Sequence, residues 1–186
     1  MKRTIAEFFL KIFGWSFESD SPILDKCVLI AAPHTSNWDF PMMLMYGFKL
    51  NLKYYWLGKH TLFFGPLGIL MRSLGGIAVD RTKKNDFVVS LSKEIASKRK
   101  FVLIIPPEGT RSRSEYWKSG FLHIARKANV PIVFGKLDYK NKNLAFSRHL
   151  SGSLSDDEIM KFAHAFYKHA NALHPSNFGP VRLKQK

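Results

Sequence analysis

The sequence feature that most constrains the fold is the uninterrupted apolar run Phe101–Ile105. A strand buried on both faces, as in a parallel sheet covered by helices, has such a continuous hydrophobic run. A second run, Val28–Ala32, also stops at a proline that opens a polar loop. The two runs therefore predict buried strands, and the loops at their carboxyl ends are where open α/β sheets keep their chemistry.

The remaining hydrophobic pattern predicts that strands and helices alternate along the chain. Residues 18–26 look like a polar connection and 138–143 like a turn. A capping box, Ser155-x-x-Glu158, predicts the start of a last helix that should reach about Leu173. This alternation predicts an α/β fold with a mostly parallel central sheet flanked by helices. The other expected strands are 53–57, 75–79, 130–137 and 144–149, and the other expected helices are 2–15, 40–48, 86–99 and 120–128, with a broken helix over 61–74.

Composition narrows the classes of function. The chain has 29 Lys and Arg against 14 Asp and Glu, a net charge of +15. Such a field attracts phosphate, whether in nucleic acid, in anionic lipid headgroups or in a soluble cofactor. A nucleic-acid-binding module is one hypothesis, but the cations are scattered and no recognition motif is present. The single cysteine, Cys27, excludes an internal disulfide framework and is interpreted as a buried structural thiol.

The N-terminal segment has the pattern of an amphipathic helix. Its apolar residues Ile5, Phe8, Phe9, Ile12 and Phe13 recur at helical spacing, opposite a polar side. Two interpretations are open: the apolar face packs on the domain, or it lies in a membrane interface. Further along the chain, lysines and arginines interrupt every apolar stretch before it reaches the roughly 20 residues of a membrane span, so we expect no transmembrane helix.

The loop after Val28–Ala32 brings an imidazole and a carboxylate close together in sequence. Histidine titrates near neutral pH, as general-base catalysis requires, and Asp39 could hold one ring nitrogen of His34. Asp39 also precedes the helix expected at 40–48 and is its predicted N-cap. Such a spacing also arises by chance, so the pair needs support from the rest of the sequence.

Two more polar loops that follow predicted strands provide this support. Asp80-Arg81 ends the strand at 75–79, and the segment from Glu108 to Arg113 follows Phe101–Ile105. Because the carboxyl ends of parallel strands share one edge of a sheet, the three loops should converge there. Their convergence predicts a functional site.

The segments that carry these residues resemble, in order, the motifs of the glycerolipid (lysophospholipid) acyltransferases. The resemblance covers roughly residues 27–140 and is specific because four motifs recur in the right order. Pro33 stands where the family often has Asn, and Phe134-Gly135 where a second proline is common. The matching segments are His34-x4-Asp39, Gly75–Arg81, Pro107–Ser112 and Val130–Val133, with Lys59, Gly65-Pro66-x-Gly68 and Trp117-Lys118-x-Gly120-Phe121.

The resemblance implies a 1-acylglycerol-3-phosphate acyltransferase-like enzyme with His34 and Asp39 as the catalytic pair. It implies transfer of a fatty acyl group from acyl-CoA or acyl carrier protein to the hydroxyl of a lysolipid, either lysophosphatidate or a related lysolipid. The thioester is a substrate, so neither a cofactor nor a metal is expected. The implied acceptor-binding residues are Arg81, Glu108, Gly109, Thr110 and Arg111, and the possible contacts with the donor or its phosphates are Lys59, Arg113 and Lys118.

His34 and Asp39 fit the chemistry of acyl transfer even when the resemblance is set aside. An alcohol that attacks a thioester must lose its proton, and a neutral His34 can accept it while Asp39 stabilises the imidazolium.

Glu108 and Arg111 have an alternative interpretation, a surface salt bridge. A hydrolase would need a serine or water site, and no Gly-x-Ser-x-Gly segment exists. A membrane adaptor without catalysis would need neither His34 nor Asp39.

The expected organisation is a single acyltransferase domain over residues 1–186. It consists of an amphipathic helix over 1–17, a motif-bearing core over 27–140 and a C-terminal helix over 155–173. Its expected partners are the lysolipid acceptor, the acyl donor and an anionic membrane surface, with no nucleic acid. We expect a cytoplasmic protein, peripheral on the inner face of the cell membrane.

Overall fold

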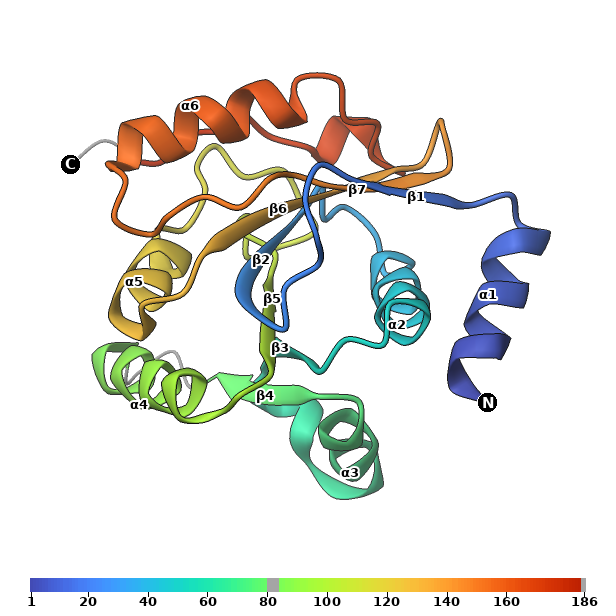
Figure 1. Cartoon of the computed structure of the whole chain (residues 1–186), viewed down its shortest axis with the longest axis horizontal. Coiled ribbons are helices and arrows are strands. Elements are labelled where there is room, and N and C mark those ends of the chain that lie inside the picture. Colours follow the sequence, from blue (N-terminus) through green and yellow to red (C-terminus); the bar gives the residue numbers. More distant parts are fainter. Residues whose placement is uncertain (80–83, 185–186) are drawn as a thin grey trace.

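The computed structural model describes residues 1–79 and 84–184, which form one seven-stranded sheet with helices on both faces (Figure 1). The strands lie in the order β1-β7-β6-β2-β5-β3-β4, and every neighbouring pair in the described sheet except β6–β7 is parallel. The predicted α/β fold with a mostly parallel sheet is confirmed. The strands are β1 (Ser16–Ser19), β2 (Lys26–Ala32), β3 (Tyr54–Lys59), β4 (Gly76–Val79), β5 (Phe101–Ile105), β6 (Ile132–Asp138) and β7 (Asn143–Phe146).

Helices cover both faces of the sheet (Figure 1). The break predicted within 61–74 is confirmed, since a 3-10 turn and a separate α-helix divide that segment. None of the described helices is both long enough and apolar enough to cross a bilayer. One face carries α1 (Lys2–Ile12), α2 (Asp39–Lys49) and α3 (Gly65–Ser73), the last preceded by the turn η1 (His60–Phe63); the other carries α4 (Lys84–Ser97), α5 (Gly120–Ala128) and α6 (Asp156–Tyr167), which is followed by the turn η2 (Pro175–Asn177).

The two central strands, β2 and β5, are buried on both sides. Alternate residues of a strand point to opposite faces. Ile30 and Leu103 enter the core beneath α4, α5 and α6, while Leu29 and Ile104 enter the core beneath α1 and α2. None of these four residues is more than 4% exposed. This two-sided burial explains the continuous apolar runs in the sequence.

Two helices end earlier than expected. α1 ends at Ile12 because the chain turns at Gly14, whose φ of 71° is readily adopted by glycine. α6 begins at the predicted capping box, but it ends at Tyr167 instead of near Leu173, so the expected helix over 155–173 is too long. Beyond Tyr167, Asn171 accepts a hydrogen bond from Tyr139 N–H and donates one to Asp138 Oδ2 at 2.8 Å. These tertiary contacts replace the last predicted turns of helix.

The edge strand β1 was not predicted, because part of it falls in the expected connection at 18–26. β1 pairs in parallel with β7, and its four residues include only one, Phe17, that is even partly buried. An edge strand has one neighbour and buries little, so its sequence shows no apolar run.

The connections of β2 and β5 determine where a site can form. The two strands are parallel neighbours, with Ile30 opposite Ile105. The helix after β2 is α2 and the helix after β5 is α5, and they cover opposite faces of the sheet (Figure 1). In open α/β sheets, ligands bind at the carboxyl edge where neighbouring connections diverge in this way. The loops that carry His34 and Glu108 both leave the sheet at this edge.

Candidate active site

The loop between β2 and α2 folds back so that Asp39 reaches His34. Asp39 N–H donates to Ser36 O, and Ser36 N–H donates to Asp39 Oδ2 at 3.0 Å, which closes a turn. His34 Nδ1 then lies 3.1 Å from Asp39 Oδ2. The number of residues between His34 and Asp39 is therefore the number that this turn needs to bring the two side chains together.

Asp39 is not the N-cap of α2, contrary to the sequence expectation. Trp38 occupies the cap position, and Asp39 is the first helical residue. Its carboxylate faces the preceding loop and β6, and Oδ1 accepts a hydrogen bond from Tyr139 Oη at 2.6 Å. Burial would raise the pKa of this carboxyl, but hydrogen bonds from His34, Tyr139 and Ser36 N–H outweigh burial and hold the pKa below its usual value. The site therefore keeps Asp39 ionised.

His34 is held from two directions. Its ring contacts Asp39 through Nδ1, and its main-chain N–H donates to Glu108 Oε1 at 3.1 Å. With Nδ1–H directed at Asp39, the neutral ring has its lone pair on Nε2. The side chain is 19% exposed, so a reacting group can approach it.

Tyr139 is a site residue that the sequence analysis missed. It directly follows β6, which pairs in parallel with β2, and its hydroxyl bonds to Asp39. Trp15 packs edge-on against its ring, with centroids 5.3 Å apart. Burial and the Asp39 carboxylate both raise the pKa of Tyr139, so its hydroxyl stays a donor. The shared-edge argument that selected three loops applies equally to the strand expected at 130–137, and it could have identified Tyr139.

Glu108 lies beneath the His34 loop and is only 3% exposed. Oε1 accepts from His34 N–H, while Oε2 is buried without a hydrogen-bond partner among the described residues. Burial raises the pKa of this carboxyl to about 7. Because Glu108 is buried, the alternative of a surface salt bridge with Arg111 is wrong.

The segment after Glu108 presents Gly109, Thr110 and Arg111 at the surface. Gly109 has a φ of 68°, in the left-handed region that favours glycine. Thr110 Oγ1 accepts from Ser112 N–H at 3.2 Å, which stabilises the turn. Arg111 makes no hydrogen bond or ion pair with any residue in the described part of the chain, so its guanidinium faces solvent near this edge.

The candidate donor contacts have different environments. Arg113 is held by the main chain and a neighbour, since Nη1 donates to Phe178 O at 3.1 Å and Nε to Glu115 at 3.2 Å. Lys118 N–H donates to Pro107 O, and its exposed side chain lies beside Gly109. Lys59 is exposed at the end of β3. Arg81, together with Asp80, lies outside the described residues.

The chain after α6 supports the loops at this edge. His174 N–H donates to Thr35 Oγ1 at 3.2 Å, next to His34. Asn171 holds Tyr139 through its main-chain carbonyl, and Arg182 O accepts from Trp117 N–H at 2.8 Å. Sequence reasoning missed these contacts because they join residues far apart in the chain, and because it extended the last helix through Asn171.

The arrangement can remove a proton from a bound hydroxyl group. It combines an accessible imidazole, a buried carboxylate that orients it and a tyrosine that fixes the carboxylate. Among the described residues, no group of three or more His, Cys, Asp and Glu side chains could hold a metal ion.

The buried carboxyl of Glu108 should make stability depend on pH. Its pKa of about 7 in the folded protein exceeds the ordinary value of 4.5, so folding stabilises the protonated form. This stabilisation is fully present below pH 4.5 and is lost as the pH rises through 7. Glu108→Gln retains an acceptor but cannot titrate. From about pH 5 to about pH 8, its free energy of unfolding should rise relative to wild type by on the order of 2–3 kcal/mol.

Denaturant unfolding at the two pH values measures this difference. Glu18→Gln, at an exposed position in β1, is the matched control and should follow wild type. A Glu108→Gln variant whose difference from wild type is the same at both pH values would contradict the assignment.

Comparisons with known proteins identify the family. No curated protein matches the sequence significantly. The fold is similar to the crystal structure of the 1-acyl-sn-glycerophosphate (LPA) acyltransferase PlsC from Thermotoga maritima, with a TM-score of 0.59 and 18% identity over 90% of this chain and 75% of that one. The family model described as Acyltransferase matches residues 17–133, which is more than half of the chain. This chain therefore belongs to the acyltransferase family.

Proposed function

We propose that this acyltransferase moves a fatty acyl group from acyl-CoA or acyl carrier protein to the hydroxyl of a lysolipid. The observation that carries the proposal is the 3.1 Å contact between His34 Nδ1 and Asp39 Oδ2 at the carboxyl edge of β2. It provides a base that a carboxylate orients. The acceptor supplies the attacking oxygen, so the enzyme needs no nucleophile of its own.

The transfer occurs by direct attack. As the acceptor oxygen bonds to the thioester carbonyl carbon, His34 Nε2 takes the hydroxyl proton. The carbon–sulfur bond then breaks and His34 returns the proton to the leaving thiolate, so an ester and a thiol form and the imidazole is neutral again. Asp39 stabilises the imidazolium while the ring carries the proton. Tyr139 and Ser36 N–H hold Asp39 in position.

Glu108 acts on this step through the main chain of His34. Its burial and its hydrogen bond to His34 N–H support a positioning role in place of the direct acceptor contact expected from the sequence. The acceptor's anionic group binds instead at Arg111, beside Gly109 and Thr110, where an exposed guanidinium matches a phosphate. Arg81 belongs to the same proposed set.

The proposed acceptor is lysophosphatidate or a related anionic lysolipid. Two observations support this choice. Arg111 is an exposed cation beside the site, and the fold is shared with a protein described as a 1-acyl-sn-glycerophosphate acyltransferase. Lys59 and Lys118, both exposed near the same edge, are the proposed contacts for the donor's phosphates, and Arg113 is a third candidate.

A lysolipid acceptor requires contact with a membrane surface, which we propose that α1 provides. The helix packs on α2 through Ala6 and Leu10, which are buried. Ile5, Phe8 and Ile12 remain 59%, 67% and 61% exposed, so the apolar face is wider than its contact with the domain. The exposed half suits the interface of an anionic membrane, the cytoplasmic face in the proposed location.

Replacing the base should abolish most activity. His34→Ala should lower turnover by about 10²–10⁴, because the acceptor hydroxyl then has no positioned base. The measurement is product formation from labelled acyl-CoA and a panel of lysolipids. His123→Ala, at an exposed position of α5, is the matched control and should retain activity. A folded His34→Ala protein with near wild-type turnover would overturn the mechanism.

Removing the proposed anion contact should affect the acceptor selectively. Arg111→Ala should raise the apparent KM for a lysophospholipid roughly tenfold, because a charge-assisted hydrogen bond is lost, while the KM for the donor changes little. In Arg113→Ala, the lost contact with Phe178 should instead lower stability, by about 1 kcal/mol. If Arg111→Ala raises only the KM for the donor, Arg111 binds the thioester donor and not the acceptor.

The exposed face of α1 can be tested by placing one negative charge either on that face or at the neighbouring position. Ile5→Glu should weaken binding to anionic vesicles roughly tenfold, because an apolar side chain leaves the interface. Thr4→Glu adds the same charge about 100° around the helix and should have a smaller effect. Vesicle co-sedimentation measures both. Equal effects would mean that charge alone is responsible.

A further inference from the structure

The segment that joins β3 to β4 exposes a concentrated apolar surface. Phe64 is 69% exposed and Ile69 72%. Leu62, Leu67 and Leu70 are between 39% and 51% exposed, and we call these five side chains the α3 patch. Large apolar side chains gathered over so short a segment mark a surface that binds something.

The α3 patch is held on a fixed base. A Cβ on Gly68 would collide with the main-chain carbonyl of Phe63, so the helix packs directly on the backbone of η1. Arg72 Nη1 donates to Phe63 O at 3.0 Å, and its guanidinium lies 5.5 Å from the Phe63 ring. Phe63 itself is buried beside Trp56. The segment is therefore already ordered, and little conformational entropy is lost when the patch binds a partner.

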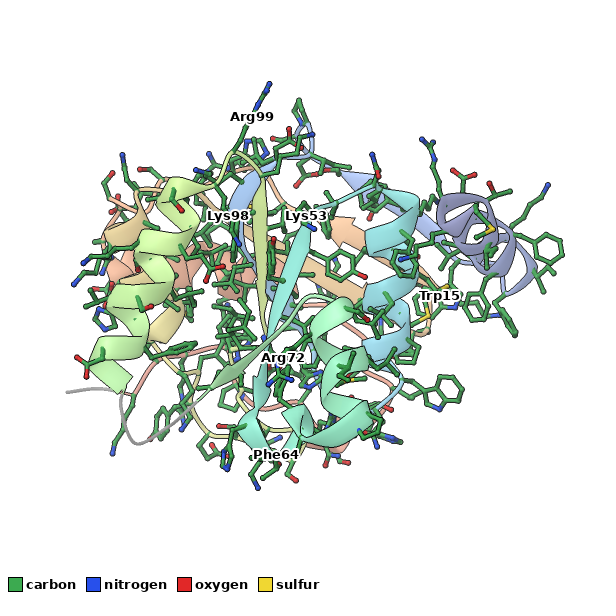
Figure 2. The ribbon with its side chains drawn as sticks, turned by 90° about the horizontal axis from the view of Figure 1, so that it is seen from below. Trp15, Lys53, Phe64, Arg72, Lys98 and Arg99 are labelled. Carbon is green, nitrogen blue, oxygen red and sulfur yellow. The ribbon has the colours of Figure 1, made fainter. Side chains whose placement is uncertain are left out.

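The patch begins at the same edge of the sheet as the active site. β3 is parallel to β5 and ends at Lys59, so η1 starts at the carboxyl edge, where the His34 loop lies. Figure 2 shows this placement: Phe64 lies at one end of the molecule, and Lys53, which precedes β3, lies toward the other. The protein has a second exposed apolar surface, the outer face of α1. Unlike that face, the α3 patch directly follows a strand that ends at the edge of the sheet where the active site lies.

The charged residues of the segment that carries the patch have one sign. No Asp or Glu occurs between Phe40 and Val79. Lys59 is exposed just before the patch, and Arg72 lies in the last turn of α3. Apolar side chains bordered by cations are complementary to a bilayer whose headgroups are anionic.

We propose that the α3 patch inserts into the surface of an anionic bilayer and forms a second attachment point beside the active site. Its role rests on the proposed function, in which the acceptor comes from the bilayer, but insertion itself requires no turnover. With the patch inserted, the edge that carries His34 and Arg111 faces the layer of lipid headgroups. A lysolipid then reaches His34 without leaving the membrane.

A second copy of the chain fits the patch less well. Pairing two copies through it would bring Lys59 of each copy toward Lys59 of the other, in a protein with a net charge of +15. Like charges at such short range oppose association. An anionic surface removes this repulsion, which favours a bilayer as the occupant.

Cysteine labelling tests the insertion directly. The native Cys27 is 3% exposed, and burial raises the pKa of its thiol to about 12, so an introduced surface cysteine reacts in preference. Ile69→Cys places an environment-sensitive fluorophore on the patch. Ile23→Cys, in the connection from β1 to β2 at the opposite edge, is the control position, with a side chain that is 39% exposed against 72% for Ile69. Vesicles of phosphatidylcholine with phosphatidylglycerol should blue-shift the label at position 69 and leave the label at 23 unchanged.

The second measurement uses Ile69→Glu with Ile23→Glu as its control. Ile69→Glu should weaken partitioning onto anionic vesicles roughly tenfold. It should also slow transfer to a vesicle-embedded lysolipid and preserve transfer to a short-chain, monomeric acceptor. Ile23→Glu should leave both rates at the wild-type level.

Three outcomes would overturn the inference: equal responses of the two labels to vesicles, unchanged vesicle binding by Ile69→Glu, or a shift of the label at 69 that needs no vesicles. A vesicle-free shift that grows with protein concentration would identify a second copy as the occupant, and one caused by added acyl carrier protein would identify that partner. If wild-type protein inserts but acylates no lysolipid, even in solution, the proposed function fails while the insertion stands.

Discussion

The parallel pairing of β2 with β5 is the constraint on which the rest of the site depends. Because the two strands run in the same direction, the loops that follow them leave from one edge, and because α2 and α5 cover opposite faces, the two connections diverge there and leave room for a ligand. The hydrogen bond from His34 N–H to Glu108 Oε1 joins the two loops. A change of register between β2 and β5 would break it and would move His34 away from the loop that carries Arg111.

The two carboxyl groups around His34 show how this arrangement separates two chemical roles. Asp39 receives hydrogen bonds from three groups, the His34 ring, Ser36 N–H and the Tyr139 hydroxyl, and these outweigh its burial, so it stays ionised. Glu108 is buried with one hydrogen-bonded oxygen and one that has no partner among the described residues, so its carboxyl resists ionisation. Environments that shift two pKa values in opposite directions are typical of acid–base sites. In the proposed reaction, Asp39 supports the imidazolium and Glu108 holds the loop.

The face of the sheet that carries α1, α2 and α3 combines a well-packed interior with an apolar exterior. Leu10 and Phe63 are buried, yet Phe8 and Ile69, on the same helices or next to them, face solvent. Burying these side chains would lower the free energy of the system, and the fold leaves them outside. Together with the excess of Lys and Arg, this exterior suits a protein that works at an anionic lipid surface.

The sequence by itself determined the features that depend on local patterns. Continuous apolar runs identified β2 and β5, the Ser155 capping box identified the start of α6, and the spacing of His34 and Asp39 indicated a base with a carboxylate partner. Only the tertiary structure decided which groups complete the site. Tyr139 reaches Asp39 because β6 lies beside β2, and α6 ends early because Asn171 binds the chain after β6. Such contacts join residues far apart in the sequence, and no local periodicity or capping preference records them.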